Sequence, residues 1–156
     1  MIIPHTHNMK LDCRKHNPFT ERVIEIMSDK GSGEYFNHKK SPTKDHGGVL
    51  EFLKRGYRVG FVGGGDYHHS TPGRHYPLRE KKGYVNTDIN KGGYAAIVSK
   101  RLYREDIWKN IYSRNTYATT GVRIFLDFKL IYGNDIISMS NEKVIKMTED
   151  KKRIFK

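Results

Sequence analysis

The stretch RVGFVGGGDYH, residues 58–68, decides the fold expected for this chain. Its first five residues form a short apolar run with the composition of a buried β-strand. Gly63–Gly65 allow the backbone to turn sharply where that strand ends, and they leave room for a ligand. Asp66 and His68 follow directly. Because ligands of α/β sheets bind beyond the carboxyl ends of the strands, the stretch predicts a strand that delivers a carboxylate and an imidazole to a binding site.

The N-terminus has the same layout. Ile2 and Ile3 are expected to end a short buried strand, and Pro-His-Thr-His follows at residues 4–7. Side chains two residues apart in an extended segment point to the same side. Carboxylate oxygens and imidazole nitrogens together suit Zn, Mn or Fe. We therefore expect one divalent-metal site, with exposed histidines and a simple turn as the alternative; its candidate ligands are His5, His7, Asp66 and His68.

The rest of the chain alternates between strand and helix patterns in the order β, β, α, β, β, α, β, β. The helix expected over residues 103–114 carries Ile107, Trp108, Ile111 and Tyr112 on one face. This order predicts an α/β fold with an antiparallel β tail, in two parts: residues 1–133, then a basic tail over residues 134–156 with room for one further strand. The other expected elements are strands at 23–27, 58–62, 94–98, 123–132 and 144–147, a helix from Asp45 to Gly56, and a turn at 117–121.

The amino-acid composition indicates which classes of partner and which compartment to expect. The 156 residues include 29 Lys and Arg against 17 Asp and Glu, a net charge of +12. Such a charge favours phosphorylated small molecules or nucleic acid, with a basic solvated surface as the alternative. Cys13 stands alone, which excludes an internal disulfide and suits a reducing compartment, so we expect a cytoplasmic protein. No apolar run approaches the roughly 20 residues of a membrane span.

Further polar residues are candidates for chemistry. Glu25 interrupts an apolar strand, either on an exposed face or as an inward group near the site, where it is a catalytic candidate. Arg74 suits an anionic substrate because arginine binds phosphate through two hydrogen bonds, and it is the other catalytic candidate. We expect His69 and His75 to contact substrate together with Arg74, with a solvated loop as the alternative. Three other histidines, His16, His38 and His46, lie in polar stretches and are expected at the surface.

Several segments, taken in order, resemble the C-terminal portion of the PHP (polymerase and histidinol phosphatase) superfamily. The nearest branch is the PHP-like domain of unknown function (DUF3604). The resemblance covers residues 3 to about 133, and the Asp-x-His and the last segment are its most specific parts. The segments are IPHTH at 3–7, EIMS at 25–28, GSGE at 31–34, GYRVGFVGGGDYH at 56–68 with PG at 72–73, GYAA at 93–96, YRE at 103–105 and YATTGVRI at 117–124.

The resemblance implies a partial (β/α) barrel of the PHP type, with up to three metals at its strand ends. It implies a metal-dependent phosphoesterase, in which a metal-activated water attacks a phosphate ester. His5 would match a later barrel ligand, and Asp66 and His68 the final pair. The family's first His-x-His strand and its further ligands have no counterpart here. The alternatives are a metal-binding remnant or subunit that needs a second copy or partner chain to complete the barrel, and a basic nucleic-acid-binding protein.

Overall fold

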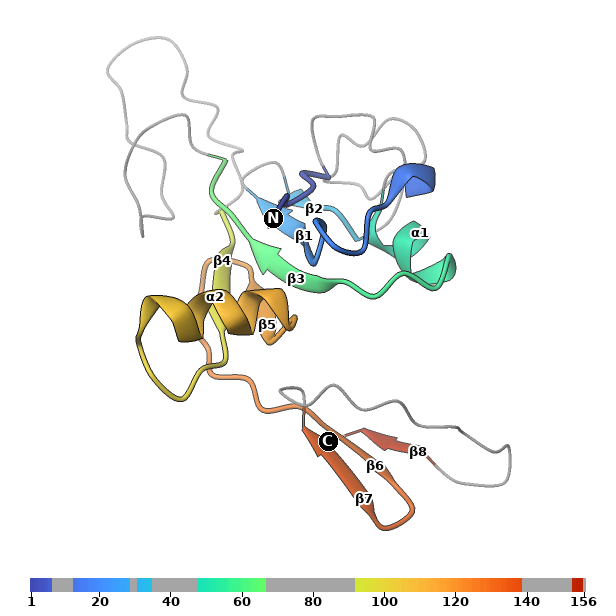
Figure 1. Ribbon diagram of the computed structural model, residues 1–156, viewed down its shortest axis with the longest axis vertical. Helices are drawn as coiled ribbons and strands as arrows, with labels where there is room; N and C mark the ends of the chain where they lie inside the picture. The colour runs from blue at the N-terminus through green and yellow to red at the C-terminus, as the bar shows by residue number, and fades with distance from the viewer. Residues whose placement is uncertain (7–12, 29–30, 35–47, 67–91, 139–152, 156) are drawn as a thin grey trace, which may run out of the picture. The chain divides into compact units, whose positions relative to one another are not determined.

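A computed structural model of the chain describes residues 1–6, 13–28, 31–34, 48–66, 92–138 and 153–155 (Figure 1). The chain divides into two compact units, Met1–Arg123 and Ile124–Lys156, each with its own sheets. The strand expected at 144–147 lies outside the described residues. No helix in the described part of the chain has both the length and the apolar character that crossing a lipid bilayer requires.

A three-stranded sheet in the order β2-β1-β3 forms the base of the first unit. β1 (Val23–Ser28) and β3 (Gly60–Gly63) run parallel, and β2 (Gly31–Ser32) pairs antiparallel with the end of β1. The register between β1 and β3 shifts between Glu25 and Met27, as at a β-bulge. Register shifts of this kind change the direction in which side chains point. This one directly follows Glu25, whose orientation the sequence left open.

Residues from the short 3-10 helix η1 (Cys13–Lys15), from β1 and from α1 (Val49–Lys54) share one apolar core. α1 begins after Gly48, later than the expected Asp45, which lies outside the described residues. The helix ends before Gly56, as predicted. The buried members of the core are Cys13, Ile24, Val49 and Phe52, and Ile26, Tyr57, Val59 and Phe61 pack against them.

The second sheet of this unit consists of β4 (Tyr94–Ile97) and β5 (Thr116–Thr119), which pair antiparallel and are connected through α2 (Arg104–Tyr112). The expected turn at 117–121 was wrong, because its first three residues are paired with β4. β5 also lies beside β3. A Cβ added at Gly60 would meet Thr116, and one added at Gly63 would meet the backbone of β4, so neither glycine can accept a side chain without a shift.

Helix α2 packs through one half of its surface. Ile107 and Ile111 are half-buried, whereas Trp108 is 52% exposed and Tyr112 is 39% exposed. At 100° per residue the exposed and half-buried positions separate into two arcs, so the expectation that all four share one packed face was wrong. The aromatic pair, four residues apart, faces solvent within the part of the chain that the structure describes.

The second unit is an antiparallel sheet in the order β7-β6-β8. It comprises β6 (Lys129–Tyr132), β7 (Asp135–Ser138) and β8 (Arg153–Phe155). A two-residue turn joins β6 to β7, and Gly133 there has φ 61°, a left-handed value that suits the first position of a type II′ turn. The long strand expected over residues 123–132 is therefore reduced to its last four residues.

The expectation of a partial (β/α) barrel was wrong. The described strands form three small sheets, and among them only β1 and β3 are paired in parallel. The strand-helix-strand pattern at β4, α2 and β5 predicted a parallel pair of strands. This was wrong, because α2 returns the chain so that β5 lies antiparallel to β4. A barrel strand would instead pair parallel to the one before it. Over the described residues the chain is a small β-rich fold without a closed barrel.

Candidate metal centre

Backbone hydrogen bonds hold the turn after β3 on both sides of Gly64. Its amide donates to the carbonyl of Met27 on β1 (2.8 Å), and its own carbonyl accepts from the amide of Gly93 (2.7 Å). Asp66 then adopts a left-handed backbone conformation, φ 45°. This conformation costs a non-glycine residue roughly 1 kcal/mol, and residues in it cluster at functional sites. The turn is thus a fixed platform that presents Asp66 in a strained conformation.

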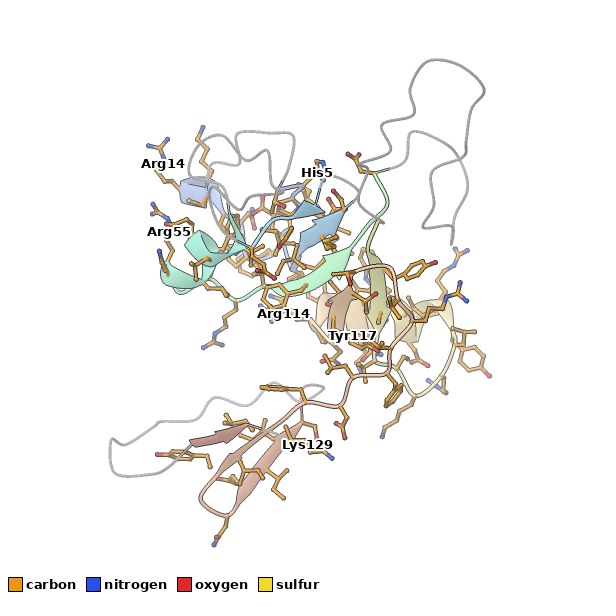
Figure 2. All side chains as sticks on the ribbon, turned by 180° about the vertical axis from the view of Figure 1, so that it is seen from behind. His5, Arg14, Arg55, Arg114, Tyr117 and Lys129 are labelled. Atoms are coloured by element: carbon orange, nitrogen blue, oxygen red, sulfur yellow. The ribbon has the colours of Figure 1, made fainter. Side chains whose placement is uncertain are left out.

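The N-terminal segment brings His5 alongside β1 (Figure 2). His5 forms an isolated parallel bridge with Glu25, whose amide donates to the carbonyl of Pro4 (3.1 Å). The hydroxyl of the buried Thr6 donates to the carbonyl of Glu25 (3.0 Å). The strand expected at Ile2 and Ile3 was wrong, since both side chains are exposed and lie outside any strand. Hydrogen bonds around Glu25 therefore place this histidine.

The two predicted strand-end motifs meet in space. The His5 Nε2 atom lies 3.6 Å from Asp66 Oδ2, and His5 Nδ1 contacts Glu25 Oε2. The side chains of His5, Glu25 and Asp66 are 26%, 14% and 20% exposed, so solvent reaches a site that is otherwise screened by protein. One imidazole lies between two carboxylates that come from different segments of the chain.

Imidazole nitrogen and carboxylate oxygen form a donor set that fits a divalent transition metal. Two such donors, each about 2.1 Å from one ion, lie roughly 3.4 Å apart at the tetrahedral angle and at most about 4.2 Å apart. The distance of 3.6 Å between His5 Nε2 and Asp66 Oδ2 falls within this range. Within the described ranges, no group of three or more His, Cys, Asp or Glu side chains is arranged to hold a metal ion. The described part therefore supplies two fitting donors.

Other predicted site residues lie where the structure gives no description. They are the candidate ligands His7 and His68 and the candidate substrate contacts His69, Arg74 and His75. Their assignments stay predictions. Of the candidates it does describe, the structure brings together His5, Asp66 and Glu25, and it places Glu25 inward beside the site, one of the two orientations that the sequence left open.

The absence of a side chain at Gly64 leaves room for the Glu25 carboxylate, a role that was not predicted from the sequence. A Cβ added at Gly64 would overlap Glu25 Oε1 and lie 3.3 Å from its Cδ, and among the described residues no other atom is close to that position. A run of three glycines after a strand indicates close approach of some group, which was the available signal. The approaching group is a side chain of β1, far earlier in the sequence, so no local pattern could name it.

His16 was expected at the surface, and this was wrong. Its side chain is only 2% exposed, and its Nδ1 is 2.8 Å from Glu21 Oε2. The ring lies against Tyr57, with centroids 4.5 Å apart, and edge-on to Phe52 at 5.6 Å. A polar sequence neighbourhood was misleading here because the aromatic residues that cover the ring come from a distant segment. His16 is part of the core and not of the candidate metal centre.

Comparison with known proteins identifies one family and several relatives that the chain resembles. The model of a family described as "Protein of unknown function (DUF3604)" matches residues 74–152. A protein of Chlamydia pneumoniae named as uncharacterized is 32% identical over 76% of this chain and 19% of its own length. An uncharacterized protein of Chlamydia trachomatis is 29% identical over 73% of the chain and 19% of its own length.

A third uncharacterized protein, from Chlamydia muridarum, is 28% identical over 80% of the chain and 21% of its own length. The chain therefore spans about one fifth of the length of the curated relatives it matches. No solved structure matches the chain.

Proposed function

We propose that this chain, which belongs to the DUF3604 family of proteins of unknown function, forms part of a metal-dependent phosphoesterase related to the PHP superfamily. The relationship to PHP proteins rests on the order of the motifs around His5, Gly63–Gly65 and Asp66. The substrate class we propose is a phosphorylated small molecule, because the net charge of +12 attracts anions. A cytoplasmic location belongs to the same proposal, since the single cysteine suits a reducing compartment.

The observation that supports the proposal most is the distance of 3.6 Å between His5 Nε2 and Asp66 Oδ2. These two residues are far apart in the sequence, each was chosen from it as a ligand, and they meet with donor atoms facing one another. At 3.6 Å they form an ion pair when His5 is protonated, and the separation is too long for a good hydrogen bond. A shared divalent cation, Zn, Mn or Fe, accounts for both the donor types and their separation.

The chain's own residues have defined tasks in this proposal. His5 and Asp66 hold the ion, and His7 and His68 are the further ligands we predict outside the described residues. When bound, the ion supplies Lewis acidity to phosphoryl oxygens and to a water molecule. Glu25, as an acidic neighbour of His5, holds a proton at Nδ1. Partial burial of the three side chains strengthens these electrostatic interactions relative to those in bulk water.

Metal analysis of the purified chain tests the proposal. We expect the wild-type chain to retain Zn²⁺ or Mn²⁺ after dialysis, and the Asp66→Ala variant to lose most of it. Hydrolysis of p-nitrophenyl phosphate should increase on addition of that metal and fall at least about tenfold in the variant. Equal metal content in the two proteins would reject the site. Metal retention without hydrolysis would favour the alternative of a metal-binding subunit that needs a partner chain.

A second candidate function, nucleic-acid binding, is favoured by the outer face of α2. Trp108 and Tyr112 face solvent there beside the exposed cations Arg104 and Lys109. The guanidinium of Arg22 lies 4.7 Å over the ring of Tyr112. Exposed aromatic rings with cations between them are the usual surface for single-stranded nucleic acid.

Fluorescence anisotropy with a labelled oligothymidylate tests this second candidate. Binding should weaken steeply as salt is raised, because phosphate contacts release counterions. It should also weaken about tenfold or more in Trp108→Ala, given the typical contribution of a stacked base. Lys54→Ala is the matched control, since this exposed lysine lies on α1. Absence of binding at low salt would dismiss nucleic acid as the partner.

A further inference from the structure

The arrangement around His5 constrains where its ring proton lies. A carboxylate can only accept hydrogen bonds, so the contact between Glu25 Oε2 and His5 Nδ1 requires a proton on Nδ1. Asp66 Oδ2, at 3.6 Å from Nε2, is too far away to compete for the proton through a good hydrogen bond. In the neutral imidazole the lone pair is then on Nε2, which faces Asp66.

The position of the Glu25 carboxylate is itself constrained. Its Oε1 occupies the space that a side chain at residue 64 would fill, and Gly64 has no left-handed backbone angle that would require glycine for conformational reasons. Glycine at this position therefore leaves room for the carboxylate where it lies, and a side chain there would displace it. The hydrogen bonds from Gly64 to Met27 and from Gly93 to Gly64 hold that space open.

We propose that Glu25 is a positioning residue for His5. Its carboxylate, which lies against Gly64, accepts a hydrogen bond from the Nδ1–H group of His5. The ring proton is thereby held on Nδ1, and the lone pair that binds a ligand is on Nε2, the nitrogen nearest Asp66. The inference rests on the proposed metal site, whose ligand would be Nε2, but it concerns residues that the structure itself brings together. A carboxylate behind a ligating histidine raises the basicity of the ligand and fixes its orientation, and its loss typically lowers metal affinity about 10–100-fold.

The tautomer of His5 can be read without any metal. In metal-free protein at alkaline pH, ¹⁵N–¹H correlation spectra should show the neutral ring of His5 protonated on Nδ1. Free imidazole side chains favour the proton on Nε2, so Glu25→Ala should return His5 to that form. Glu25→Gln offers both an acceptor oxygen and an amide donor, so it should hold the Nδ1 proton less completely than the wild-type carboxylate. An Nε2-protonated ring in the wild-type protein would overturn the inference.

Metal affinity gives the second readout, by calorimetric titration with Zn²⁺. Glu25→Ala should lower the affinity about 10–100-fold, and Glu25→Gln should lower it less. Gly64→Ala should resemble Glu25→Ala, because the new methyl group displaces the carboxylate. In the Glu25→Ala background, adding Gly64→Ala should change the affinity no more than about twofold, since the carboxylate that it displaces is already absent. Two independent losses that multiply would overturn the link between the residues.

Failure of this inference is distinguishable from failure of the metal site. If the wild-type chain binds no more Zn²⁺ than Asp66→Ala, the metal site is rejected, and the tautomer of His5 still decides the role of Glu25. If the wild-type chain binds Zn²⁺ and Asp66→Ala does not, affinity equal to wild type in Glu25→Ala rejects the positioning role alone. Circular dichroism of each variant establishes that the comparison is made between folded proteins.

Discussion

His16 lies against Tyr57, with the ring centroids 4.5 Å apart and the ring planes inclined by 33°. The imidazole is almost completely buried, and its Nδ1 lies 2.8 Å from the Glu21 carboxylate oxygen Oε2, which accepts its hydrogen bond. A backbone contact holds the acid in turn, since the amide of Asn17 donates to Glu21 Oε2 (3.1 Å). A histidine in a polar stretch of sequence thereby becomes part of the apolar core built on β1 and α1.

Replacement of His16 by Ala should lower the free energy of unfolding by about 2–3 kcal/mol, because the substitution removes a buried ring and leaves a cavity beside Phe52 and Tyr57. Urea denaturation followed by circular dichroism measures the change. The control is Glu21→Gln, which keeps an acceptor near the ring and should cost less than about 1 kcal/mol. Equal stability of His16→Ala and wild type would contradict the packing of this ring.

Arg114 should carry a conformational penalty at the end of α2. The amides of Arg114 and Asn115 donate to the carbonyls of Ile111 and Asn110 in a Schellman motif, and Arg114 has φ 64° where glycine is usual. Both Arg114→Gly and Arg114→Ala remove the side-chain hydrogen bond to Arg58. The glycine variant should therefore be the more stable by about 1 kcal/mol, measured by thermal or urea unfolding. A more stable alanine variant would contradict the left-handed conformation.

Gly63 and Gly64 should respond to alanine in different ways. A Cβ at Gly63 would lie 2.8 Å from the carbonyl oxygen of Tyr94, so Gly63→Ala must push β3 and β4 apart. Overpacking of this kind costs about 1–3 kcal/mol. Gly64→Ala meets only the end of a flexible side chain and should leave the melting temperature nearly unchanged. The reverse order of melting temperatures in a scanning calorimeter would refute the assignment of these two glycines.

Asp106 should make stability depend on acid pH. The hydrogen bond from Arg101 lowers the pKa of this carboxyl, with a smaller contribution from charge attraction, while burial acts in the opposite direction. Because the folded pKa is depressed, the contribution to stability is complete above the unfolded value of about 3.9 and is lost as pH falls through the folded pKa.

The difference in melting temperature between wild type and Asp106→Asn should therefore shrink as pH is lowered below about 4. The Arg101→Gln background is the control, since the same substitution there should have a smaller effect at neutral pH. A difference that is independent of both pH and the partner would count against the ion pair. Raised salt should weaken the effect, because solvent reaches both groups.

Local patterns predicted several elements, and their failures are physically informative. The sequence predicted β1, β3, β4 and α2, because each has an apolar run or a helical spacing typical of its element. β5 was missed because its Thr-Tyr-Ala-Thr sequence is a strand only when β4 pairs with it. The turn between β6 and β7 was overlooked, although Gly133 followed by Asn134 between two apolar runs is a known hairpin signal.

In the candidate site, too, some features were predicted from the sequence and others were seen only in the structure. Two strand-end motifs predicted that His5 and Asp66 would meet, because each was expected to carry donor side chains directly after an apolar run, and the structure brings them to 3.6 Å. The orientation of Glu25 could not be read from its strand, where a carboxylate suits either face. The contact of the carboxylate with His5 and the space left by Gly64 show that it faces the site, beside the register shift between Glu25 and Met27.

By itself, the sequence determined the positions of β1, β3, β4 and α2 and which residues have donor side chains suited to a metal, because these depend on the spacing and type of neighbouring side chains. Only the tertiary structure decided that the strands form small, mainly antiparallel sheets, that His16 is buried, and that Glu25 lies behind His5. Each of these depends on contacts between segments far apart in the chain, whose free energy no local pattern contains.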